Sequence, residues 1–260
     1  MSTILQINNL NYGLFHDFNL TIDEEKFISI IGSNKSGKTT LFNVISGIIP
    51  TTHVVSIKEN DLTRQNVNNY IKSIGLVSKC QNNSFLFTKV YDEMSYPLKN
   101  LGYCDRFIKR RINKILGLFS LDIIDKEINQ LTEYEKQVLL FCIALLHKPK
   151  LLLIDDVFSF MMEDDVNKII DVLKNIKSLS IINFSSNLNQ LSKSDYVYVL
   201  GSGKIVLEGN AQTIKNENQL LMKLGLEVPF IDNLSNKLKE IGIINCDFNN
   251  LEDLVNTLWK

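Results

Sequence analysis

The segment from Gly32 to Thr39 reads G-S-N-K-S-G-K-T and matches the phosphate-loop pattern GxxxxGK[ST] in full. Glycines let the backbone N–H groups of such a loop turn toward phosphate oxygens, and the following helix points its positive end at the same oxygens. The lysine suits the terminal phosphates, and the hydroxyl after it suits Mg²⁺. The predicted phosphate-binding residues are Gly32, Ser33, Asn34, Lys35, Ser36, Gly37, Lys38, Thr39 and Thr40, with Thr39 also a Mg²⁺ ligand.

The surroundings of this loop decide between phosphate binding and an ordinary glycine-lysine turn. Residues 27–31 form a continuous apolar run that suits a strand buried on both faces. After the loop, apolar residues recur at helical spacing until Gly47 and Pro50 end the helix. A strand before the loop and a helix after it are the context that phosphate binding requires.

A second element, LLLIDD at residues 151–156, is an apolar strand that ends in two carboxylates. Asp155 is predicted to hold Mg²⁺ through water, and Asp156 to orient or deprotonate an attacking water. Alone, the pair could equally be a solvated turn after a buried strand. The phosphate loop upstream favours the catalytic interpretation.

Strands alternate with helical segments along the chain, which predicts an α/β fold with a mainly parallel sheet and helices on both faces. Strands are expected at 3–22 (two, around a turn near Tyr12 and Gly13), 27–31, 151–154, 181–184 and 196–207 (a hairpin), with short strands and turns over 54–77. Helices are expected within 91–147 and at 163–177, 211–224, 231–242 and 251–259.

The composition limits the class of protein. The chain has 260 residues, of which 45% are hydrophobic, so it can bury a real core. A net charge of −1 gives no electrostatic reason to expect nucleic-acid binding. The longest apolar run, residues 138–146, is too short to span a membrane, so any membrane role is expected to come through a partner. The scattered cysteines and histidines form no metal-ligand pattern.

The two motifs, their separation and the helical region between them resemble an ATP-binding cassette (ABC) ATPase. More narrowly, the tail, with LGLEVPFIDNLSNKLKEIGI at 224–243 and LEDLVNTLW at 251–259, is similar to that of the first ATPase subunit of energy-coupling factor (ECF) importers. The resemblance implies a P-loop NTPase fold with a mainly parallel core sheet, an antiparallel β subdomain and a helical subdomain. It places the nucleotide-binding domain at 1–212, with the helical subdomain at about 88–147. A helical extension at 213–260 is then a candidate for subunit pairing.

The same resemblance implies a mechanism and a set of partners. The cofactors would be ATP and Mg²⁺, each ATP lying between the phosphate loop of one subunit and the LSGGQ-type signature of a second ATPase subunit, in a heterodimer or a homodimer. A transmembrane coupling subunit and a substrate-binding membrane subunit would complete an importer of a vitamin or other micronutrient. The chain would sit peripherally on the cytoplasmic face of the membrane. Tyr12 falls where the family has an aromatic that stacks on adenine, although it could simply pack in a turn.

The segment that matches the family signature departs from it. Where the family has LSGGQ, this chain has Leu131, Thr132, Glu133, Tyr134 and Glu135. Thr132 keeps a hydroxyl, but a carboxylate beside a triphosphate is repulsive, and two side chains replace glycines that allow close backbone approach. We expect this degenerate signature to clamp ATP less well than LSGGQ.

Four further positions differ from the family pattern. Asp156 replaces the catalytic glutamate, and a carboxylate displaced by about 1 Å can cost on the order of a hundredfold in rate. Ser186 replaces a histidine after the third core strand, and Met162 replaces an aspartate contacted across the dimer. Lys79 aligns with the glutamine of the loop before the helical region, although Gln81 could take its place if the loop shifts.

Two hypotheses therefore remain open. The chain is either a slow ATPase subunit, in which Asp156 still activates water and a sibling subunit supplies the rest, or a binding clamp that holds ATP and leaves hydrolysis to its sibling. The candidate catalytic residues are Asp156, Ser186 and Lys79. A soluble ABC protein of translation or DNA repair is disfavoured, because the chain has neither a second cassette nor a long coiled-coil insertion.

Overall fold

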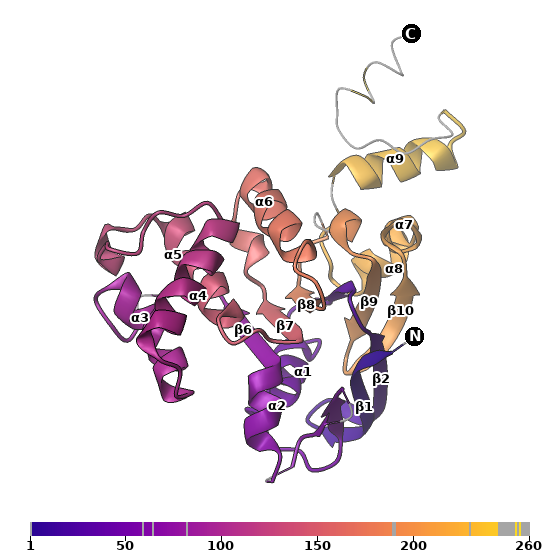
Figure 1. Ribbon diagram of the computed structural model, residues 1–260. Helices are drawn as coiled ribbons and strands as arrows, with labels where there is room; N and C mark the ends of the chain where they lie inside the picture. The colour runs from indigo at the N-terminus through magenta and orange to yellow at the C-terminus, as the bar shows by residue number, and fades with distance from the viewer. Residues whose placement is uncertain are drawn as a thin grey trace.

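The computed structural model describes residues 2–58, 60–63, 65–81, 83–188, 191–228 and 230–243, together with residues 253 and 255. Its centre is a six-stranded sheet in the order β10-β9-β3-β8-β7-β6 (Figure 1). The strands of this sheet are β3 (Phe27–Ile31), β6 (Ile74–Ser78), β7 (Leu151–Asp155), β8 (Ser180–Ser185), β9 (Tyr196–Gly201) and β10 (Lys204–Gly209). All neighbours pair in parallel except β9 and β10, which form the expected antiparallel hairpin.

A second sheet is antiparallel and has the order β2-β1-β4-β5. Its strands are β1 (Thr3–Tyr12), β2 (Phe15–Asp23), β4 (Val55–Ile57) and β5 (Asn60–Asp61). The two sheets and the helices confirm the predicted α/β fold class, with a parallel core sheet and an antiparallel β subdomain.

The helices cover the core sheet and form a separate group at one end. They are α1 (Lys38–Ile45), α2 (Val67–Ser73), α3 (Val90–Asn100), α4 (Asp105–Leu118), α5 (Glu133–Leu145), α6 (Glu163–Lys174), α7 (Ala211–Asn216), α8 (Asn218–Lys223) and α9 (Phe230–Glu240). Short 3₁₀ turns are η1 (Ile128–Gln130), η2 (Phe158–Phe160) and η3 (Leu191–Lys193). In Figure 1, α3, α4 and α5 lie at the end of the molecule opposite β1, β2, β9 and β10. Within the described part of the chain, no helix is both long and apolar enough to cross a bilayer.

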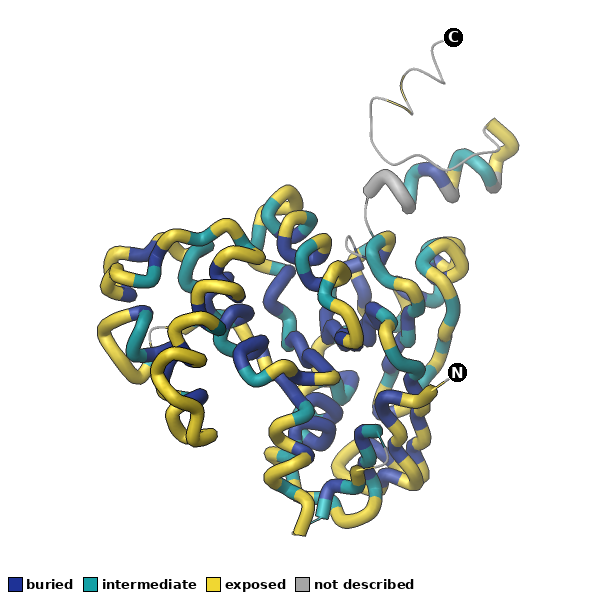
Figure 2. Tube along the Cα trace, viewed as in Figure 1, coloured by how far each residue is buried: buried dark blue, intermediate teal, exposed yellow. Residues whose placement is uncertain are grey.

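The core lies on both faces of the parallel sheet. One cluster joins the sheet to α3, α4, α5 and α6, and another joins it to α1 and the antiparallel sheet. All five residues of β3 are buried, as the continuous apolar run predicted. Figure 2 shows the resulting pattern, with buried strands inside and exposed outer helix faces. This packing fixes the strand ends that carry the functional residues.

Two local expectations were wrong. Residues 67–73 form helix α2 rather than strands and turns, because Tyr70 is fully buried and its hydroxyl donates to the carbonyl of Ile45 at 2.6 Å. The single helix expected at 211–224 is two helices, α7 and α8, separated at Glu217, whose backbone is not helical. The helix expected at 251–259 lies almost entirely outside the described residues.

The predicted domain boundary between residues 212 and 213 falls within α7. Both α7 and α8 pack on the core sheet, since Ile214 and Leu221 share a buried cluster with Val197 and Val199. The division into a domain at 1–212 and an extension at 213–260 stays a prediction.

Candidate functional site

The phosphate loop links the end of β3 to the start of α1. Gly37, just before α1, has φ 111°, a left-handed conformation that favours glycine. A Cβ on Gly32 would lie 2.6 Å from the carbonyl oxygen of Leu200, so this close approach also requires glycine. No side chain caps the N-terminus of α1, which leaves its first N–H groups available to a ligand. The loop therefore has the shape and donors of an anion cradle.

Lys38 reaches back across this loop. Its ammonium donates to the carbonyls of Gly32 at 2.6 Å and Ser33 at 3.0 Å. Partial burial lowers the pKa of Lys38, while the carboxylates of Asp156 and Asp155 oppose that shift. A half-buried cation held by two carbonyls lacks full charge compensation, which a phosphate group would supply.

Asp155 and Asp156 lie at the end of β7, opposite the loop. Burial raises the pKa of Asp155, and the neighbouring Asp156 raises it further, whereas Lys38 lowers it. The half-buried Asp155 is thus short of positive charge. It and Thr39 are oxygen donors of the kind that Mg²⁺ prefers, so the residues present fit that ion.

Asp156 sits in an unusual backbone position, with φ 51°. Its N–H donates to the carbonyl of Phe184 on β8 at 2.8 Å. The hydroxyl of Ser159 donates to Asp156 Oδ1 at 2.6 Å, which fixes the direction of the carboxylate. Among the described residues, Oδ2 of Asp156 makes no hydrogen bond, so this oxygen is available to accept a proton.

These elements enclose a pocket of about 530 Å³. Its lining includes Asn34, Lys35, Gly37, Lys38, Thr39, Thr40, Lys79, Asp155, Asp156 and Ser186 from the prediction. It also includes Leu14, Ser78, Gln81 and Phe160. The structure thus brings the loop, the two carboxylates and Ser186 to one cavity, and the role of Ser186 stays a prediction. Gly32, Ser33 and Ser36 lie in the loop behind this surface.

Lys79 and Gln81 both reach the pocket, so the choice between them stays open. The ammonium of Lys79 lies 3.3 Å from the centre of the Phe160 ring, a cation–π contact. The backbone N–H of Gln81 donates to the Ser84 hydroxyl at 2.7 Å. Sequence reasoning missed Phe160, and its only signal was a large aromatic shortly after the two aspartates.

Tyr12 lies at the end of β1 and is 48% exposed, but it does not line the pocket. Leu14, in the turn after it, does. Stacking of Tyr12 on adenine stays a prediction.

The degenerate signature has a structural task at the start of α5. The N–H of Glu135 donates to Thr132 Oγ1 at 3.1 Å, and the N–H of Thr132 donates to Glu135 Oε2 at 2.8 Å. This reciprocal capping box satisfies two N–H groups at the helix start. The hydrogen bond from the Thr132 backbone is the main reason that the pKa of Glu135 is lowered. The hydroxyl of Thr132 is therefore engaged within its own chain.

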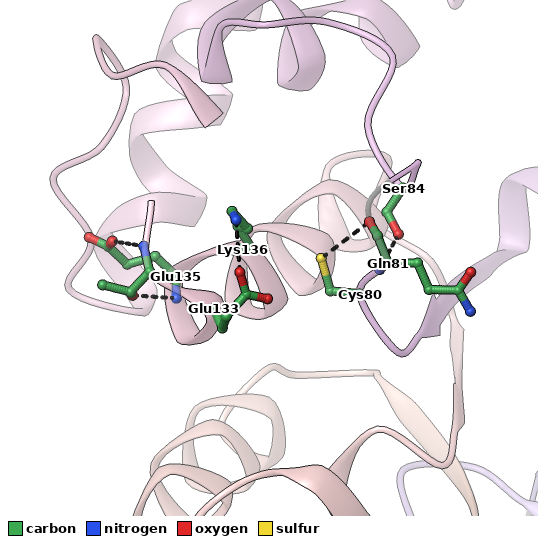
Figure 3. A network of polar contacts seen from close by, with 7 residues as sticks. Cys80, Gln81, Ser84, Glu133, Glu135 and Lys136 are labelled. Atoms are coloured by element: carbon green, nitrogen blue, oxygen red, sulfur yellow. Dashed lines mark hydrogen bonds and ion pairs between the residues drawn. The ribbon is translucent and has the colours of Figure 1, made fainter. Parts of the chain in front are cut away.

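The rest of this segment faces different surroundings. Leu131 is buried, and Tyr134 packs against the helical core cluster. Glu133 is exposed and pairs with Lys136 at 2.8 Å, beside the loop that carries Cys80 and Gln81 (Figure 3). None of the five signature residues lines the phosphate-loop pocket. Met162, the other predicted cross-dimer position, is 79% exposed.

Comparison with known proteins agrees with this geometry. The family described as ABC transporter matches residues 15–159. The energy-coupling factor transporter ATP-binding protein EcfA1 of Bacillus licheniformis is 28% identical over 244 residues, which cover 92% of this chain and 87% of that protein. The protein of the same name from Oenococcus oeni is 27% identical over 270 residues, covering 99% and 98%.

Solved structures share the fold. CbiO1 of Clostridium perfringens, part of an ABC transporter complex, matches with a TM-score of 0.77 at 24% identity, over 90% of this chain and 99% of that one. An ATP-binding cassette of an ABC transporter in its ADP conformation matches with a TM-score of 0.73 at 21% identity, over 86% and 99%.

Proposed function

Because this chain belongs to the ABC transporter family, we propose that it is the ATP-binding subunit of an energy-coupling factor importer and hydrolyses ATP slowly at its own site. The observation that carries the proposal is the convergence of Lys38, Asp155, Asp156 and Ser186 on one pocket at the phosphate loop. The relatives named as energy-coupling factor ATP-binding proteins support the narrower assignment.

The residues divide the work as follows. The N–H groups at the start of α1 and the ammonium of Lys38 bind the phosphates of ATP. Thr39 and Asp155 would hold Mg²⁺, which supplies positive charge at the terminal phosphates. Oδ2 of Asp156 accepts the proton of the attacking water, while Ser159 holds Oδ1 and so limits rotation of the short side chain. Ser186, which lines the same pocket, donates one hydrogen bond to a phosphate in this proposal.

The partners follow from the incomplete site. The degenerate signature lies away from this chain's pocket, so it serves the site of a second ATPase subunit, and that subunit supplies its own signature here. A transmembrane coupling subunit and a substrate-binding membrane subunit complete the importer of a vitamin or other micronutrient. The chain binds them from the cytoplasmic face of the membrane.

A second candidate function is a clamp that binds ATP without hydrolysing it. The observation that favours it is that Asp156 and Ser186 line this chain's own pocket at the positions where the family has a glutamate and a histidine, whose side chains reach further. In that case the sibling subunit hydrolyses ATP, and this chain only transmits the closure of the ATPase pair to the membrane subunits.

One experiment separates the two candidates. We would co-express the chain with its sibling ATPase and membrane subunits and compare ATP turnover of the wild-type complex with Asp156→Asn, which removes the base at nearly constant size. Asp164→Asn, on the exposed first turn of α6, is the matched control. A fall of tenfold or more in Asp156→Asn alone supports hydrolysis at this site. Unchanged turnover in an active complex supports the clamp.

A further inference from the structure

Helix α4 carries an unusually basic outer face. From Lys99 to Lys114 the chain has six basic side chains and a single acidic one, Asp105, although the whole protein has a net charge of −1. We define the α4 basic face as Arg106, Lys109, Arg110 and Lys114, all of which are exposed. Together with the start of α3, this face borders a shallow hollow of about 530 Å³.

Among the residues that the structure describes, none forms an ion pair with any member of the α4 basic face. Arg111 differs, because its guanidinium donates to the carbonyls of Leu146 at 2.9 Å and Leu145 at 2.7 Å and so ties α4 to the end of α5. The contrast indicates that the outward charges are available to an external partner.

Aromatic side chains flank the same face. Tyr103 and Phe107 stack with their ring centres 4.5 Å apart, and they are 45% and 38% exposed. Leu101, in the turn before α4, is exposed as well. The apolar stripe that α4 needs for folding is already buried on its other side, through Ile108, Ile112, Ile115 and Leu116. The exposed rings are therefore additional apolar surface next to the basic charges.

We propose that the α4 basic face, with Tyr103 and Phe107, contacts the anionic lipid headgroups of the membrane surface. Basic side chains beside exposed rings match this partner, since phosphate headgroups attract the charges and the rings insert at the boundary with the acyl chains. A nucleic acid or an acidic protein would also be attracted by the charges. The proposal rests on the proposed function in one respect, because that function places the chain beside a membrane.

The contact is an auxiliary one. The buried isoleucines hold α4 in the protein, so only side chains of its outer face and the preceding turn can enter the interface. Such a contact would orient the subunit beneath its membrane partners, but it would not hold the subunit at the membrane without them.

The test uses the full chain and vesicles of phosphatidylcholine with or without phosphatidylglycerol, at low and high salt. We expect binding to the anionic vesicles that weakens as salt increases. The triple variant Arg106→Gln, Lys109→Gln, Arg110→Gln should lose about fivefold per side chain, on the order of a hundredfold in all. Phe107→Ser should weaken binding to anionic vesicles at both salt concentrations.

A matched control removes the same charge elsewhere. Lys72, Lys204 and Lys223 are exposed and lie outside the α4 basic face, so their triple change to Gln should leave most of the vesicle binding. Equal losses in both triple variants would overturn the proposal, because binding would then depend on net charge alone. A second result would also overturn it: the chain binds an RNA or an acidic peptide more tightly than the anionic vesicles, and Phe107→Ser does not change vesicle binding.

Failure of this inference and failure of the proposed function give different results. ATP binding in solution is measured on every variant, and the α4 triple variant should bind ATP as the wild type does. A chain that binds ATP but no anionic vesicles refutes the membrane contact alone. A chain that binds these vesicles through α4 but binds no ATP refutes the proposed function alone.

Discussion

The contact between Lys79 and Phe160 joins two pocket residues whose side chains could each meet a nucleotide. An ammonium 3.3 Å from a ring centre is stabilised there, but the same ammonium could pair with the terminal phosphate of ATP. The Phe160 ring and the terminal phosphate compete for the ammonium of Lys79. Substitutions of Lys79 and of Phe160 should therefore change the affinity for ATP in opposite directions if Lys79 moves from the ring to the phosphate.

We predict that Lys79→Gln weakens ATP binding by about tenfold and ADP binding less, since a cation near the terminal phosphate is lost. Phe160→Ala should instead tighten ATP binding about two- to fivefold, because a partly exposed cation–π contact is worth about 0.5–1 kcal/mol. Titration calorimetry with ATP and ADP measures both. If Phe160→Ala weakens ATP binding, the ring itself contacts the nucleotide.

Asp155 offers a pH prediction with a definite sign. Its pKa is raised, so the folded protein holds its proton to a higher pH than the unfolded chain does. Between the ordinary value of 3.8 and that raised pKa, wild-type stability should fall as pH increases, and the loss should be complete above the window.

Asp155→Asn removes this cost. Without ligand, we expect the melting temperature of this variant to exceed that of the wild type at pH 7. The difference should vanish as the pH falls below the ordinary carboxyl pKa of 3.8. Mg²⁺-dependent ATP binding should be lost. Thermal unfolding across pH, with and without Mg-ATP, measures both effects. A variant less stable than the wild type at neutral pH would show that Asp155 stabilises the fold by pairing with Lys38.

At the scale of elements, the beginning of α5 is capped by two residues of the segment that aligns with the family signature. The side chains of Thr132 and Glu135 form a reciprocal capping box there. Serine, threonine and glutamate at these positions favour a capping box wherever they precede an apolar helix.

We predict that Thr132→Ala destabilises the chain by about 1 kcal/mol, the usual cost of removing a cap. Thr132→Ser is the conservative control and should be close to neutral. The lowered pKa of Glu135 adds a pH dependence, because its share of the stability is present above its unfolded pKa and is lost as pH falls through the folded value. Chemical denaturation at neutral and acidic pH measures this, and equal stability of both variants would contradict it.

The parts of the site that depend on local sequence were predictable. The phosphate loop and the Asp155–Asp156 pair each follow an apolar strand, and parallel strands bring their carboxyl ends to one edge of the sheet. The Lys79–Phe160 contact was not predictable, because it depends on how two loops meet in space. Helix α2 was missed because a seven-residue segment gives a weak periodic signal, and burial of Tyr70 decided its structure.

At the scale of the whole molecule, the chain has its phosphate pocket and its degenerate signature in different places. Under the proposed function, each would act in a different nucleotide site once a second ATPase subunit is bound. Stability of this chain and activity of the partner's site would then favour different residues at Glu133 and Tyr134.

We predict that changing the segment Thr132 to Glu135 into Ser-Gly-Gly-Gln raises ATP turnover of the complex, because it removes the carboxylates of Glu133 and Glu135 and admits close backbone approach. The same change should lower the melting temperature of this chain, since two glycines in the first turn of a helix cost about 1 kcal/mol each and the packing of Tyr134 is lost. Unchanged turnover would mean that the partner's site does not use this segment.

The thiol of Cys104 stands at the start of α4, next to the stacked rings of Tyr103 and Phe107, and it is exposed. Cys142 is buried, and Cys80 is half-buried with a thiol pKa that burial raises, so we expect both to react with maleimides more slowly than Cys104. With Cys246 changed to serine, a fluorophore can thus be attached selectively at Cys104. Its emission would report, in real time and in the assembled complex, whether the start of α4 moves from water into lipid.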